Sequence, residues 1–124
     1  MSKDEAVSSI KKALEELEQA LEAYSQKDPE EVSRRIWVAS SEAEYALFLL
    51  GISLDSEFPN SLKAKASQSR RVEPQGHMVK AQELLRSALE SYRSEGDLRK
   101  LYKAVWEARG YLIELQEKRG RGLP

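Results

Sequence analysis

The chain has 124 residues, no cysteine and nearly balanced charge, with 20 basic and 21 acidic side chains and a formal net charge of −1. This length fits one domain whose core is large enough to fold without disulfides or a structural metal. The lack of cysteine excludes disulfides, thiolate metal sites and cysteine nucleophiles within this chain. The balanced charge indicates no particular class of partner.

Neither the N-terminal residues nor the apolar segments resemble membrane or export signals. The longest apolar run covers residues 46–52, whereas a membrane-spanning helix needs about 20 residues. Residues 1–5 include two acids, and no apolar core follows them as it would in a secretory signal. We therefore expect a cytoplasmic protein without membrane contact. A single asparagine and a charged fraction of 33% favour a thermophilic source.

Helical spacing and capping residues predict a first hairpin over residues 2–51. The chain begins with the spacing of a capping box, and apolar residues then recur every three or four positions. The first helix is predicted to stop near Lys27. Asp28 and Pro29, followed by two glutamates, are typical of a new helix start. The second helix is predicted to end at Gly51.

A long connector, residues 52–75, precedes a second predicted hairpin over residues 76–120. The connector contains prolines and a basic stretch, which we interpret as a solvated linker; electrostatic contact with a nucleic acid is its alternative role. In the second hairpin, Gly96 ends one helix and Asp97 caps the next. The whole chain, residues 1–124, is predicted to form a single helical domain.

The two hairpins look like copies of each other. A shift of 69 positions aligns the second helix of each hairpin and places Trp37 on Trp106. A shift of 68 positions aligns the first helices with seven identities, at Ala13, Glu15, Leu17, Ala20, Leu21, Glu22 and Tyr24. Tryptophan and tyrosine are rare in this chain, so their matches favour a duplication. We predict an all-α fold, a four-helix up-and-down bundle made of two duplicated antiparallel hairpins.

The second helix carries more apolar surface than one core contact uses. At about 100° per residue, part of this surface lies beside the core stripe or further round the helix. We expect it to form the interface of a homo-oligomer, most simply a dimer, through Trp37, Val38, Tyr45, Phe48 and Leu49. Cover from Phe58 and Leu62 of the connector is the intramolecular alternative.

No residue pattern indicates a cofactor, a metal ion or a phosphate loop, and we predict none of them. His77 is the only histidine, so one chain lacks the second histidine of a typical zinc cage. Glu42 and Glu44 flank the crowded centre of the second helix, and we expect them to be surface residues, with a polar network within the assembly as the alternative. Three further acids are predicted to be solvated surface, namely Glu15, Glu18 and Glu22.

Residues 33–43, with the sequence Ser-Arg-Arg-Ile-Trp-Val-Ala-Ser-Ser-Glu-Ala, resemble the second helix of short archaeal HEPN-like helical proteins of the PaREP type. The second copy, residues 96–108, is similar to it. The resemblance implies a helical bundle that dimerises. It also implies a candidate activity, because toxin members of the wider superfamily are metal-independent ribonucleases that use an arginine and a nearby histidine. Arg71 and His77, with five residues between them, fit the spacing of four to six residues that those ribonucleases have.

Two functional hypotheses follow. The first is a non-enzymatic interaction or scaffold protein that works as a homo-oligomer and has a protein partner. The alternative is a HEPN-like protein that binds or cuts nucleic acid, with His77 as acid or base and Arg71 stabilising phosphate charge. Pro74 and Gly76 argue against the alternative, because a proline inside the segment would interrupt a helix carrying both residues on one face.

Overall fold

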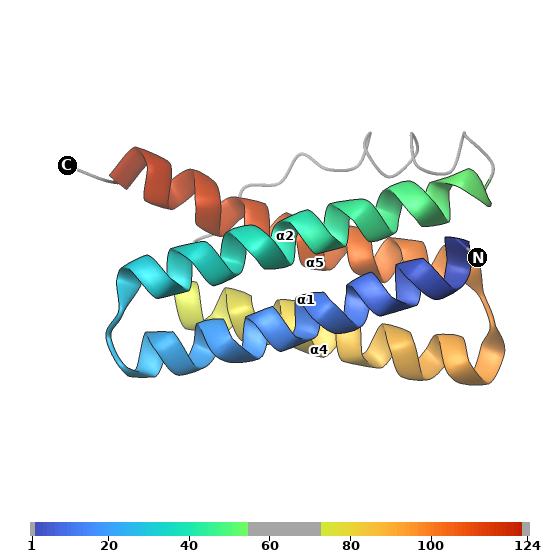
Figure 1. Cartoon of the computed structure of the whole chain (residues 1–124), viewed down its shortest axis with the longest axis horizontal. Coiled ribbons are helices and arrows are strands. Elements are labelled where there is room, and N and C mark those ends of the chain that lie inside the picture. The colour runs from blue at the N-terminus through green and yellow to red at the C-terminus, as the bar shows by residue number, and fades with distance from the viewer. Residues whose placement is uncertain (1, 55–72, 123–124) are drawn as a thin grey trace.

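The computed structural model describes residues 2–54 and 73–122 of the chain. These residues form four helices, α1 (Ser2–Ser25), α2 (Pro29–Ile52), α4 (Pro74–Glu95) and α5 (Leu98–Gly122). The helices pack as two antiparallel hairpins that lie against each other in one bundle (Figure 1). The predicted all-α class and its two hairpins are therefore confirmed.

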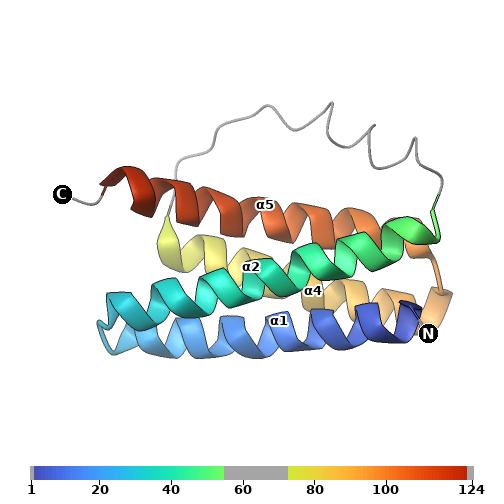
Figure 2. The same ribbon diagram turned by 45° about the horizontal axis from the view of Figure 1, so that its top comes forward.

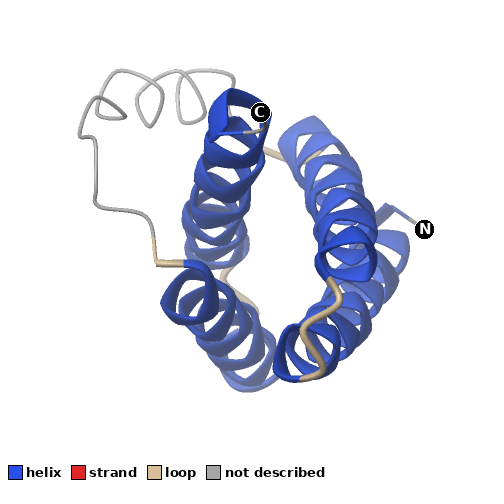
Figure 3. Ribbon diagram, turned by 90° about the vertical axis from the view of Figure 1, so that its left-hand side faces the viewer, coloured by secondary structure: helices blue, strands red, loops and turns tan. Residues whose placement is uncertain are grey.

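The order of the helices around the bundle is α1, α2, α5 and α4, so each helix contacts two neighbours (Figure 3). Helices α2 and α4 run in the same direction (Figure 2) and lie diagonally opposite each other (Figure 3). This arrangement differs from the simple up-and-down order expected from the hairpin pattern. A short turn forces the next helix to be an antiparallel neighbour, whereas the long connection between α2 and α4 imposes no such constraint.

The two hairpin turns share one backbone geometry. Lys27 and Gly96, which the shift of 69 aligns, both have left-handed backbone with φ of 60° and 68°. The next residues, Asp28 and Asp97, each accept a hydrogen bond at 3.2 Å from the backbone N–H three residues further on. Each aspartate therefore caps the second helix of its hairpin. The shared turn agrees with the predicted duplication.

Small side chains bring α1 and α2 together. Their facing surfaces contain fully buried alanines, and this helix pair makes the most extensive contact in the bundle. Alanine permits close approach of two helix axes because interaxial distance depends on the side chains between them. Larger side chains fill the centre where all four helices meet, namely Ile10, Leu17, Ile36, Leu50, Met78, Leu85, Leu101, Val105 and Leu112.

The left-handed turn residues provide a test of the fold. Gly96→Ala should lower the free energy of unfolding by about 1 kcal/mol, because alanine strains the backbone at φ 68° while its Cβ meets nothing within 4 Å. Lys27→Gly should raise it by up to about 1 kcal/mol, because glycine adopts the same conformation without strain. Urea unfolding measures both changes. A destabilising effect of Lys27→Gly would contradict the proposed equivalence of the turns.

Candidate functional site

The most exposed large apolar side chains of the described residues gather on one face of α2. Trp37, Phe48 and Ile52 are 64%, 66% and 63% exposed, and Tyr45 is 46% exposed. Together with Ser41, these residues recur at steps of three or four and fall within an arc of about 80° on an ideal helix. We call this outward stripe of five residues the α2 ridge.

The ridge contains most of the interface residues expected from the sequence. Trp37, Tyr45 and Phe48 lie on it, and Val38 is half-buried beside it. Leu49 is different, because it is only 7% exposed and belongs to the core of the single chain. It lies two turns after Glu42 on the side of α2 that faces α1. Leu49 is therefore covered without a second subunit.

The C-terminal end of the ridge was missed by sequence reasoning. Gly51 was expected to end the second helix, but α2 continues through Gly51 to Ile52. One further turn of helical spacing after Phe48 would have found Ile52. The intramolecular alternative for covering the ridge, Phe58 and Leu62, lies outside the described residues.

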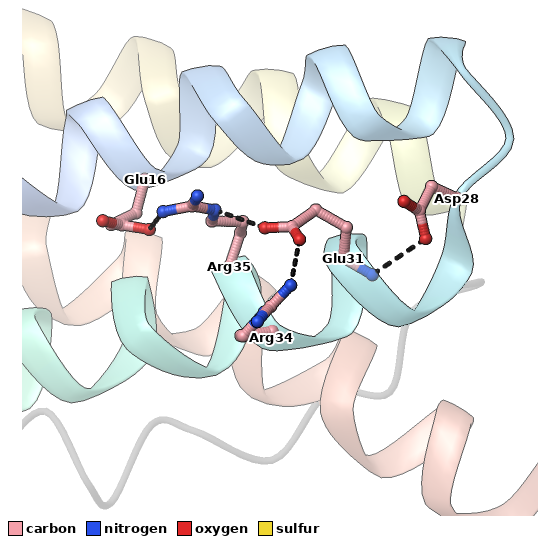
Figure 4. Close-up of polar contacts among 5 residues, drawn as sticks. All are labelled: Glu16, Asp28, Glu31, Arg34 and Arg35. Atoms are coloured by element: carbon pink, nitrogen blue, oxygen red, sulfur yellow. Dashed lines mark hydrogen bonds and ion pairs between the residues drawn. The ribbon is translucent and has the colours of Figure 1, made fainter.

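Arg35 ties α2 to α1 at one end of the ridge (Figure 4). Its Nη1 donates to Glu16 of α1 at 2.9 Å, and its Nε donates to Glu31 at 2.7 Å. Arg34 also pairs with Glu31. The hydrogen bond from Arg35 lowers the pKa of Glu31, and the bond to Glu16 raises the pKa of Arg35. These contacts favour the charged forms of both partners and fix the position of the first turns of α2.

Further ion pairs lie on both sides of the ridge. On the α5 side, Arg109 donates from Nε and Nη2 to Glu44 Oε1 at 3.0 and 2.7 Å. On the α1 side, Lys12 Nζ lies 3.8 Å from Glu42. Glu44 is therefore an exposed surface residue and Glu42 is half-buried, and each pairs with a base of the same chain. Such exposed pairs add little stability, but they neutralise charge beside an apolar surface. The three acids expected at the surface of α1 are exposed.

Tyr45 is the ridge residue that has a polar anchor. Its hydroxyl donates a hydrogen bond to Glu5 Oε2 of α1 at 3.1 Å. This bond, with the charge of Glu5, raises the pKa of Tyr45 because both favour the protonated phenol. The ring therefore lies toward the α1 side, while Trp37, Phe48 and Ile52 project from the bundle.

His77 occupies a different place, at the start of α4 and against α5. It is only 5% exposed, and its Nε2 lies 2.7 Å from Glu114 Oε2. Its Nδ1 accepts a longer hydrogen bond, 3.4 Å, from the backbone N–H of Glu73. The ring of Tyr111 meets it edge-on, with centroids 5.1 Å apart. With Nδ1 as the acceptor of the Glu73 N–H, Nε2 is the nitrogen that can donate a hydrogen bond to Glu114 Oε2.

These contacts explain how α4 begins. The N-cap residue Glu73 makes no side-chain capping bond, and the ring of His77 accepts its backbone N–H instead. This resembles the reciprocal bond that glutamate makes in a capping box. Pro74 was expected to interrupt a helix here, but it is the first residue of α4, where the missing N–H has no consequence. Arg71, the other candidate catalytic residue, lies outside the described residues.

The position of His77 is unfavourable for acid or base catalysis. A catalytic histidine needs a ring nitrogen within hydrogen-bond reach of the substrate. Here the side chain is buried, and both ring nitrogens contact residues of the chain. The arrangement instead braces the first turn of α4 against α5.

Other kinds of site are not apparent in residues 2–54 and 73–122. No group of three or more histidine, cysteine, aspartate or glutamate side chains in these ranges is arranged to hold a metal ion. Among the same residues, no helix combines the length and apolar character that crossing a membrane requires. Comparison with protein-family models, with curated proteins and with solved structures finds no match to this chain.

The structural role of His77 can be tested by substitution. His77→Ala should lower the free energy of unfolding by about 1–3 kcal/mol, because it removes a buried ring and its hydrogen bonds. Glu114→Gln should lower the free energy of unfolding less in the His77→Ala variant than in the wild type, because the two side chains interact. Chemical unfolding measures both, with the exposed Ser87→Ala as control. Equal effects of His77→Ala and Ser87→Ala would contradict the brace.

Proposed function

We propose that this chain is a non-enzymatic interaction protein that assembles with copies of itself through the α2 ridge. The observation that carries the proposal is the exposure of Trp37, Phe48 and Ile52 on one face of one helix. Burying a large apolar side chain contributes about 1.5–3 kcal/mol relative to leaving it in water. Three such residues in line therefore favour association, against the loss of translational and rotational freedom that association costs.

The size and surroundings of the ridge also support an interface. At their observed exposures, its three aromatic side chains present about 350 Å² to solvent, which is comparable to the largest apolar patch of a typical monomer, a patch that is often functional. The ion pairs Arg35–Glu16 and Arg109–Glu44 lie on its two sides. An apolar centre with a polar rim is the usual organisation of a protein–protein interface.

Association is measured directly by sedimentation. The wild-type chain should show a concentration-dependent increase in mass, and Phe48→Glu should remain monomeric with its helical unfolding transition intact, because Phe48 lies outside the core. Val79→Glu is the control, since Val79 is also an exposed apolar residue but lies on α4, diagonally opposite. A wild-type chain that stays monomeric at high micromolar concentration would rule out self-association.

The ribonuclease hypothesis has less support, because it depends on a histidine that is buried between α4 and α5. We expect the purified chain and its His77→Ala variant to leave labelled single-stranded RNA and transfer RNA equally intact. We expect this because the buried ring of His77 does not come within hydrogen-bond reach of a substrate in solution. Cleavage by the wild type that disappears in His77→Ala would make the ribonuclease hypothesis the better one.

A further inference from the structure

Large side chains flank one small side chain along the α2 ridge, and this order restricts the shape of the surface that can pack against it. Trp37 and Phe48 are large, and Ser41, the only small residue of the ridge, lies between them. The Ser41 hydroxyl donates to the Trp37 carbonyl at 3.0 Å. The small side chain of Ser41 therefore leaves a shallow depression in the ridge, and its hydroxyl already has a hydrogen-bond partner within the helix.

Two copies of α2 can lie antiparallel with their ridges facing each other and a two-fold axis at the midpoint between residues 44 and 45. This arrangement brings complementary residues together. Trp37 of one copy then faces Ile52 of the other, and Phe48 faces Ser41. A large side chain thus enters the space above a small one, as knobs enter holes in packed helices. Because of the two-fold axis, each contact occurs twice in the dimer: Phe48 of each copy packs on Ser41 of the other.

We propose that the ridge pairs with the same ridge of a second copy of this chain, with the two α2 helices antiparallel about a two-fold axis between residues 44 and 45. The inference rests on the proposed function and adds its geometry. A parallel pairing is disfavoured by the same residues. It would place Phe48 on Phe48 and Trp37 on Trp37, and Ser41 on Ser41 would leave a gap.

The charge near the proposed axis is compatible with this pairing. Glu44 lies next to the axis, so two Glu44 carboxylates approach each other. Each already accepts hydrogen bonds from Arg109 of its own chain at 3.0 and 2.7 Å. The axis therefore brings together two neutral ion pairs instead of two bare like charges, which would oppose association.

The apolar surface available indicates a weak dimer whose formation depends on concentration. The aromatic side chains of two ridges together present about 700 Å², against a total of about 1,600 Å² for a standard stable interface. The ion-paired margins toward α1 and α5 would supply further contact. A second copy provides this complementary surface by symmetry, whereas a foreign helix would need to match the same order of large and small residues.

Cysteine chemistry can distinguish the two orientations, because the chain contains no cysteine of its own. Full-length Ser41→Cys and Phe48→Cys chains are mixed and treated with a short bis-maleimide cross-linker. Antiparallel pairing predicts covalent dimers from the mixture in clear excess over either variant alone. Ser87→Cys is the matched control, because Ser87 is exposed on α4 on the opposite side of the bundle and should give no cross-linked dimer.

A distance measurement avoids disturbing the ridge. Arg34→Cys carries a spin label on the exposed side of α2, one turn before Trp37. Across the proposed axis, two such labels are separated by about 30 Å along the helices, from a rise of 1.5 Å per residue. In a parallel pair, the same labels would be separated mainly by the interaxial distance of about 10 Å.

The outcomes separate this inference from the proposed function. Cross-linking between positions 41 and 48, with a label distance near 30 Å, supports the antiparallel pair. A dimer by sedimentation that cross-links Ser41→Cys to itself, or gives a short label distance, overturns the orientation and leaves self-association in place. A chain that stays monomeric at high micromolar concentration overturns both proposals, and protection of position 41 from maleimide in that monomer would indicate cover by the chain itself.

Discussion

The contact between α1 and α2 determines how the rest of the bundle is built. Fully buried alanines, including Ala13 on α1 and Ala43 on α2, occupy the surface between these helices. Close packing of this kind leaves little room for large side chains. The inner side of α2 therefore combines alanines with a few large residues such as Ile36 and Leu50 that reach the common core. The aromatic residues Trp37 and Phe48 of the same helix face outward instead.

The two hairpins correspond in the positions of their polar contacts as well as in their turns. The shift of 68 aligns Glu5 with Glu73, and the shift of 69 aligns Tyr45 with Glu114. In the first hairpin, Tyr45 of the second helix bonds to Glu5 near the start of the first helix. In the second hairpin, Glu114 bonds to His77, one turn after Glu73. Both hairpins thus place a polar bridge between corresponding parts of their two helices. This correspondence favours a structural role for His77.

Much of the fold was predictable because helix signals are local. The Asp28 cap and the hairpin turn at Gly96 follow from residues adjacent in sequence, and both are present in the structure. The start of α4 was placed two residues late because Pro74 was interpreted as an interruption instead of a first helical residue. Its contacts with α5 were beyond sequence reasoning, since Glu114 lies 37 positions after His77.

The candidate site was predictable only in part, for a different reason. Periodicity gives the angle of a residue around its own helix, but it does not show which angles a neighbouring helix covers. Trp37 and Leu49 therefore looked equivalent as residues outside the main stripe. In the structure, Leu49 is buried and Trp37 projects into solvent. Trp106, which the shift of 69 aligns with Trp37, packs partly against the core, so the alignment of the two hairpins does not predict exposure either.

The two helices of the first hairpin provide an internal comparison for the meaning of the ridge. The outer face of α1 carries acids that are exposed, such as Glu15 and Glu18, and the same fold presents Trp37 and Phe48 on α2. Folding places no demand for aromatic residues on either outer face, since charged residues serve there and improve solubility. Exposed aromatics in an aligned stripe instead favour contact with another molecule. The difference between these two faces is therefore better explained by association through α2 than by the stability of the single chain.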